Sequence, residues 1–134
     1  VSPLDTATRT KEVIDAVGSP SLRFNSDPVN FIPSIPLAYD NRRVIDDLVE
    51  ALGDRTAAAH IKDFVIEDRL VVHIAERPAC QGLLDTEYFL RRFEAVCPDG
   101  WVLIEHISDD LVPAAAEAMR ATATRAGLTW NEPS

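Results

Sequence analysis

Four stretches of the chain are predicted to be helices. In residues 5–17 and 40–52, apolar side chains recur three and four positions apart, which is the spacing of an amphipathic helix. Residues 85–96 have the same spacing, and residues 110–126 form the last predicted helix. Glycine follows the first, second and fourth of these stretches, as expected where a helix ends.

Three short segments between these helices are predicted to be strands. Residues 21–26 alternate between apolar and polar side chains, and Pro28 ends the segment because proline has no N–H to donate. Residues 56–62 contain three alanines, which favour helix, but the segment is too short for one and follows a helix-ending glycine. Residues 101–104 are almost entirely apolar, which is typical of a strand covered on both faces.

The remaining segments predict a hairpin and a loop. Residues 64–66 and 71–74 are expected to pair as two arms, with Glu67-Asp68 between them, and the prolines in residues 31–39 indicate an irregular loop. Strands that alternate with helices of ten or more residues imply a parallel sheet with right-handed crossovers. The predicted fold class is therefore α/β, with about three principal parallel strands and flanking helices.

Composition narrows the possible partners. The chain has 134 residues, 46% of them hydrophobic and 26% charged, which indicates one globular domain. Its net charge of −9 argues against nucleic acid, because phosphate binding needs clustered positive charge. No apolar run approaches the roughly 18 residues needed to cross a bilayer. The two cysteines form no CxxC pattern, which favours a reducing, cytoplasmic location.

Ionisable side chains follow each of the three predicted strands. Asp27 follows the first, His60 lies at the end of the second, and Glu105 follows the third. Because the carboxyl ends of parallel strands line the ligand site in α/β folds, we expect these three residues to converge. One imidazole and two carboxylates favour Mn²⁺, Mg²⁺, Co²⁺ or Zn²⁺. Each residue also has an ordinary structural explanation, as a turn former, a hydrogen-bonded core histidine or a solvated acid.

Four short motifs resemble segments of one known family, and they follow one another along the chain in the order found in that family. Residues 59–63 resemble its H-[IL]-K-D segment, and residues 27–30 resemble its D-x-x-[NH] strand end. Residues 103–106 match an [IL]-E-H strand end, while residues 81–85 resemble a G-x-[IVL]-[DN] entry to a helix. The family is that of the sugar phosphate isomerases and epimerases, which are xylose isomerase-like TIM barrels.

This resemblance implies the C-terminal portion of a (β/α)8 barrel, with residues 1–134 as a single partial domain. It also implies a Glu, Asp, His, Glu metal set, of which Asp27, His60 and Glu105 match the last three members. The first glutamate has no match, because residues 1–20 predict a helix and Glu12 lies in its middle. A barrel of this kind has roughly 250 residues. We therefore expect a piece of something longer or a processed chain, which begins at Val1.

The implied activity is proton transfer in a sugar or sugar phosphate. The divalent metal would hold adjacent substrate oxygens and stabilise the enediolate, with Glu105 as one of two catalytic carboxylates. Four further side chains are expected to contact the substrate, namely Asn30, Lys62, Asp63 and Arg77. His106 is expected to support the ligands without binding the metal itself.

Two other functions remain open at this point. The chain could be a non-catalytic assembly module that completes a barrel with another chain, which would supply the N-terminal portion, or with a second copy. It could also resemble the endonuclease IV group, which shares the barrel and acts on DNA. Against that, Lys62 stands where that group has asparagine, no H-x-H cluster is present, and the net charge is −9.

Overall fold

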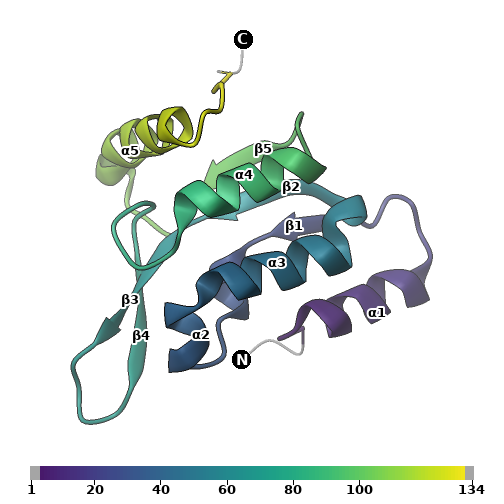
Figure 1. Cartoon of the computed structure of the whole chain (residues 1–134), viewed down its shortest axis with the longest axis horizontal. Helices are drawn as coiled ribbons and strands as arrows, with labels where there is room; N and C mark the ends of the chain where they lie inside the picture. The colour runs from purple at the N-terminus through teal and green to yellow at the C-terminus, as the bar shows by residue number, and fades with distance from the viewer. Residues whose placement is uncertain (1–3, 132–134) are drawn as a thin grey trace.

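The computed structural model describes residues 4–131, so residues 1–3 and 132–134 of the predicted domain lie outside the described part (Figure 1). The helices are α1 (Ala7–Val17), α2 (Ile35–Tyr39), α3 (Asn41–Leu52), α4 (Thr86–Val96) and α5 (Val112–Arg125). The strands are β1 (Phe24–Ser26), β2 (Thr56–Ile61), β3 (Asp63–Glu67), β4 (His73–Arg77) and β5 (Trp101–Ile104). No helix among these residues is long and apolar enough to cross a membrane.

Three strands form one parallel sheet in the order β1-β2-β5. The register places Ser26 opposite Ala59, and Ile61 opposite Ile104. Helices α3 and α4 cover one face of this sheet (Figure 1). The predicted α/β fold class, with three parallel strands and flanking helices, is confirmed.

The core lies between the sheet and these helices. One cluster joins Ala59 and Ile61 of β2 to Phe89 and Phe93 of α4. A second cluster packs Phe24 of β1 against the apolar side of α3, which presents Val44, Leu48 and Leu52. The alanine-rich segment is therefore a strand, as predicted, with Ala59 fully buried.

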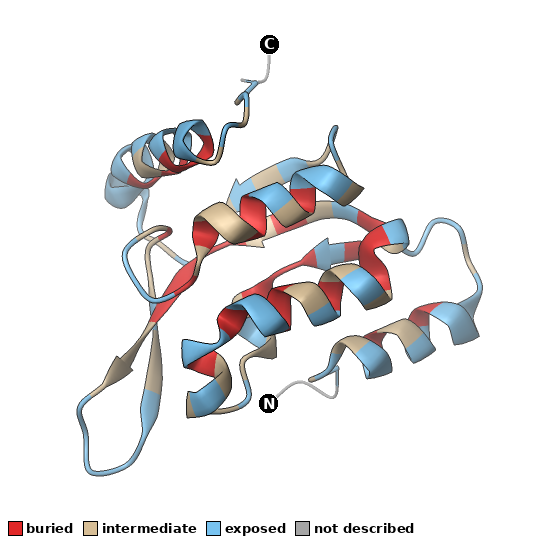
Figure 2. Cartoon of the chain, viewed as in Figure 1, coloured by how far each residue is buried: buried red, intermediate tan, exposed pale blue. Residues whose placement is uncertain are grey.

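The other face of the sheet carries exposed apolar side chains. Side chains alternate between the two faces of a strand, so Val102 and Ile104 of β5 pack against the core while Trp101 and Leu103 point the opposite way. Trp101 is 61% exposed and Leu103 is 47% exposed, and Figure 2 shows much of β5 in the colour of exposed residues. The prediction that residues 101–104 are covered on both faces is therefore wrong for this chain.

Two other expectations need correction. The predicted loop over residues 31–39 contains α2, a helix that begins after Ser34 with proline in its first turn, a position where proline needs no N–H partner. The predicted hairpin exists, but β4 extends to Arg77 and the turn spans residues 68–72. The hairpin projects from the body of the molecule (Figure 1).

Asp63 fixes the base of this hairpin. Its side chain is buried, with Oδ1 accepting hydrogen bonds from the backbone N–H groups of Phe64 and Leu84 at 2.8 and 2.9 Å. Oδ2 accepts from the N–H of Gly82 at 2.8 Å. Gly82 has no room for a side chain, since a Cβ atom there would lie 2.1 Å from the carbonyl oxygen of Phe64. One carboxylate therefore joins β3 to the loop before α4.

This placement predicts a large stability cost for Asp63→Ala. The change leaves three backbone N–H groups without their acceptor in the interior, which should lower the free energy of unfolding by about 3 kcal/mol. Urea denaturation measures this free energy of unfolding. Asp68→Ala makes the same change at the exposed hairpin turn and should cost at most about 0.5 kcal/mol. Equal stability of the two variants would contradict the role given to Asp63.

Candidate metal centre

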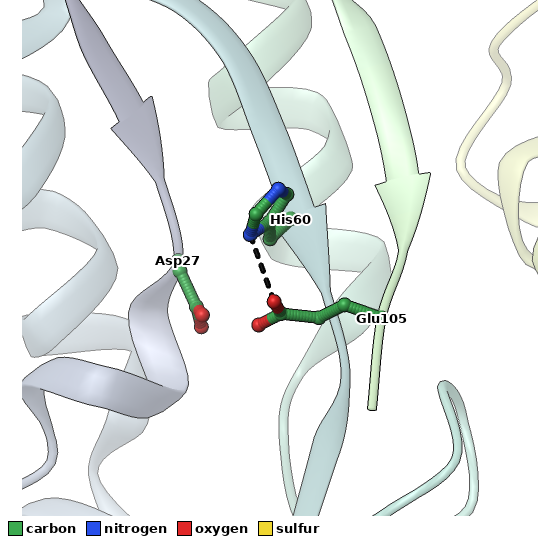
Figure 3. Close-up of side chains that lie close together, drawn as sticks. All are labelled: Asp27, His60 and Glu105. Carbon is green, nitrogen blue, oxygen red and sulfur yellow. Dashed lines mark ion pairs between the residues drawn. The ribbon is translucent and has the colours of Figure 1, made fainter. Parts of the chain in front are cut away.

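The three strands of the parallel sheet bring three potential metal ligands together. Asp27 directly follows β1, His60 is the next-to-last residue of β2, and Glu105 directly follows β5. All three strands run in the same direction, so these positions meet at the carboxyl edge of the sheet (Figure 3). One ligand atom from each residue lies within 4.8 Å of the other two. The predicted convergence is therefore present in the structure.

His60 and Glu105 contact each other directly. The imidazole Nδ1 lies 2.9 Å from Oε2 of Glu105, an ion pair when the histidine is protonated. Figure 3 shows the carboxylate of Asp27, after β1, turned toward that of Glu105, after β5, across the central strand β2. The Asp27 side chain is almost fully buried, while Glu105 and His60 are partly exposed. The cluster is thus open to a ligand from the side of His60 and Glu105.

Lys62 places a positive charge between the two carboxylates. Its Nζ lies 2.7 Å from Oε1 of Glu105 and 3.0 Å from Oδ2 of Asp27. The residue is only 1% exposed. Burial alone would lower the pKa of Lys62, but its hydrogen bonds to Glu105 and Asp27 raise the pKa above its ordinary value. Lys62 is therefore a charged ammonium group in the interior.

The two carboxylates differ in their affinity for protons. Burial, followed by the hydrogen bond with Glu105, raises the pKa of Asp27 to about 6. Burial also acts to raise the pKa of Glu105, but hydrogen bonds with Asp27 and Lys62 outweigh it and lower the pKa to about 2. Glu105 is therefore ionised at neutral pH, and Asp27 holds a proton in mildly acidic solution.

The donor set fits a divalent cation. Oδ1 of Asp27 is buried and has no hydrogen-bond partner among residues 4–131, although a buried carboxylate oxygen normally has one. Two carboxylates and one imidazole are ligands that Mg²⁺, Mn²⁺ and Zn²⁺ all accept. A cation bound here would supply Oδ1 with the partner that it lacks.

The other predicted site residues divide into two groups. Asn30 lies beside the ligands, where its Nδ2 donates to Oδ2 of Asp27 at 2.6 Å, and His106 Nε2 lies 3.6 Å from Oε2 of Glu105. Arg77 instead points along the hairpin and contacts Glu67 at 3.5 Å. The carboxylate oxygens of Asp63 accept backbone N–H groups at the hairpin base. Contact of Asp63 or Arg77 with a substrate stays a prediction, and this placement does not support it.

Glu76 belongs to the cluster, although the sequence did not reveal it. Glu76 pairs with Phe64 in the hairpin, and β4 therefore brings Glu76 back to the carboxyl edge of the sheet. Its Oε1 lies 3.3 Å from Nζ of Lys62, and its Oε2 lies 3.0 Å from Nδ1 of His106. The residue could have been found by extending the second arm of the predicted hairpin from residue 74 to Arg77.

His106 has an unusual backbone conformation. Its φ of 55° lies in the left-handed region, which residues other than glycine seldom adopt. This turn directly follows Glu105 and brings the imidazole between Glu105 and Glu76. The end of β5 is therefore shaped so that two successive side chains both reach the cluster.

Comparison with known proteins identifies a similar fold. No protein-family model matches the chain, and no curated protein matches it. Among solved structures, the chain is similar to the xylose isomerase domain protein from Planctomyces limnophilus, with a TM-score of 0.68 and 22% sequence identity. The match covers 91% of this chain and 43% of that one, so the chain spans less than half the length of the similar structure. The predicted resemblance to part of a xylose isomerase-like barrel is confirmed at the level of fold.

The raised pKa of Asp27 predicts that metal affinity depends on pH. Below pH 6 a proton occupies Asp27, and a cation has to displace it. Titration calorimetry with MnCl2 should therefore show affinity falling by up to about tenfold per pH unit from pH 6 to pH 5. Between pH 7 and pH 8, where Asp27 is already ionised, the affinity should change little. Constant affinity from pH 5 to pH 7 would contradict this assignment.

Proposed function

We propose that this chain is part of a metal-dependent isomerase or epimerase that acts on a sugar or sugar phosphate. The observation that carries the proposal is the convergence of Asp27, His60 and Glu105, together with the buried Oδ1 of Asp27, which has no hydrogen-bond partner among residues 4–131. The fold likeness to a xylose isomerase domain protein supports it. The metal, if bound, would polarise a carbonyl and stabilise negative charge on adjacent substrate oxygens.

The residues of this chain have distinct tasks in the proposed reaction. Asp27, His60 and Glu105 would hold the cation, and Glu105 would also exchange a proton with the carbon beside the carbonyl. Asn30 donates a hydrogen bond to Asp27 and so fixes the orientation of that ligand. His106 lies 3.6 Å from Oε2 of Glu105 and forms an ion pair with it when protonated. Such supporting contacts typically govern both the orientation and the basicity of metal ligands.

A second chain segment is needed to complete a barrel. The open face of the sheet exposes Trp101 and Leu103, two apolar side chains that would be buried in the interior of a closed barrel. We therefore propose that the partner is the remaining portion of a barrel, on the same or another chain, or a second copy of this chain. That partner would supply the second proton-transferring carboxylate.

The same open face supports a second candidate function, that of a non-catalytic assembly module. In that case the acidic cluster would serve only to hold the strand ends together through Lys62. Metal content separates the two functions, since an assembly module needs no cation. An endonuclease-like function has no comparable support, because the net charge of −9 opposes binding to DNA.

A cytoplasmic location is part of the proposal. Cys80 and Cys97 both carry free thiols, as expected in a reducing compartment.

The ligand assignment predicts that His60→Ala and Glu105→Gln each abolish tight binding of a divalent metal, because each change removes one of three ligands. Equilibrium dialysis with Mn²⁺, followed by elemental analysis, measures the bound metal, and circular dichroism checks that the variants fold. His73→Ala is the matched control, since it removes an exposed imidazole from the first residue of β4. Stoichiometric metal in both ligand variants would refute the assignment.

A further inference from the structure

Lys62 contacts the same two carboxylates that a metal would bind. Its ammonium group contacts Oε1 of Glu105 and Oδ2 of Asp27, and both residues belong to the ligand set. At 1% exposure, its charge is less screened by water than that of a surface lysine. A divalent cation that binds Asp27, His60 and Glu105 would therefore meet a second positive charge within a few ångströms, and the two cations would repel each other.

A second position for the ammonium group lies next to the first. Oε1 of Glu76, which lies in strand β4 of the hairpin, is 3.3 Å from Nζ of Lys62. The side chain of Glu76 is 49% exposed, in contrast to Asp27 and Glu105. Rotation of the flexible lysine side chain toward Glu76 would release the oxygens of both ligands and still leave the ammonium paired.

We propose that Lys62 is the resident cation of the metal-free site, and that an incoming divalent ion displaces it onto Glu76. Lys62 and Glu76 are thus positioning residues with opposite effects on metal affinity. Lys62 weakens metal binding, because it must give up its contacts with Asp27 and Glu105. Glu76 strengthens metal binding, because it receives the displaced charge. The inference deepens the proposed function, since it concerns the same three ligands.

The metal-free protein depends on Lys62 in this scheme. Without the ammonium, the carboxylates of Asp27 and Glu105 would face each other with no positive charge between them, and like charges in such a position destabilise a fold. Lys62→Met keeps the length of the side chain but removes its charge. The variant should therefore melt at a lower temperature than the wild type in the absence of metal, and adding Asp27→Asn should restore part of the loss.

The affinity test uses calorimetric titration with MnCl2 at pH 7.5 on four proteins besides the wild type. Lys62→Met should bind Mn²⁺ about tenfold more tightly, and Glu76→Gln about tenfold more weakly, which is the usual size of an effect exerted through a neighbour of a ligand. In the double variant, Glu76→Gln should not lower the affinity for Mn²⁺ further, because without Lys62 there is no ammonium group for Glu76 to pair with. Glu67→Gln, which removes a hairpin carboxylate paired with Arg69 and Arg77, should bind like the wild type.

Several results would overturn the inference. One is that Lys62→Met binds Mn²⁺ no more tightly than the wild type. Another is that Glu76→Gln weakens binding equally with and without Lys62, since Glu76 would then act on the metal directly. If Lys62→Met does not fold, the comparison of Glu76→Gln with Glu67→Gln still decides, because equal affinities would contradict the role of Glu76.

Mn²⁺ affinity and melting temperature together distinguish failure of this inference from failure of the proposed function. If neither the wild type nor Lys62→Met binds Mn²⁺, the metal-dependent function fails and the displacement with it. The resident position of Lys62 is tested without metal by the melting temperatures. An unchanged melting temperature in metal-free Lys62→Met would overturn that position even if the wild type binds Mn²⁺ at Asp27, His60 and Glu105.

Discussion

The candidate site depends on one buried ammonium group. Lys62 contacts carboxylates from β5 and β1 through Glu105 and Asp27, and it also reaches Glu76 of the hairpin. Without a cation these acids would repel one another at the edge of a three-stranded sheet. The ammonium therefore joins three segments that are distant in sequence, and it does so at the place where a divalent ion would bind. The same interaction serves stability in the metal-free chain and opposes metal binding.

Strand direction and side-chain alternation made much of this site predictable. Asp27, His60 and Glu105 each stand at the end of a segment whose local pattern predicts a strand, so parallel pairing alone brings them together. Glu76 was missed because its position depends on the register of an antiparallel hairpin whose second strand is longer than its most apolar part. The motif around Asp63 predicts a substrate contact, because it does not reveal that backbone N–H groups of a distant loop surround the carboxylate.

The pattern of apolar residues predicts the helices correctly and the burial of β5 incorrectly. Helical spacing identified α1, α3 and α4, because one apolar face of each packs against the core. For β5, an unbroken apolar run predicts burial on both faces, but Trp101 and Leu103 are exposed. Apolar side chains on the open face are what a strand needs inside a closed barrel, so the sequence of β5 agrees better with the proposed assembly than with an isolated sheet.

A crystal of the chain soaked with MnCl2, with anomalous scattering recorded to locate manganese, would show whether the site binds a metal and where Lys62 then lies. We expect one manganese ion bound by Asp27, His60 and Glu105, with the ammonium of Lys62 turned toward Glu76. No manganese at these residues at a saturating concentration, with Lys62 still between Asp27 and Glu105, would contradict this expectation.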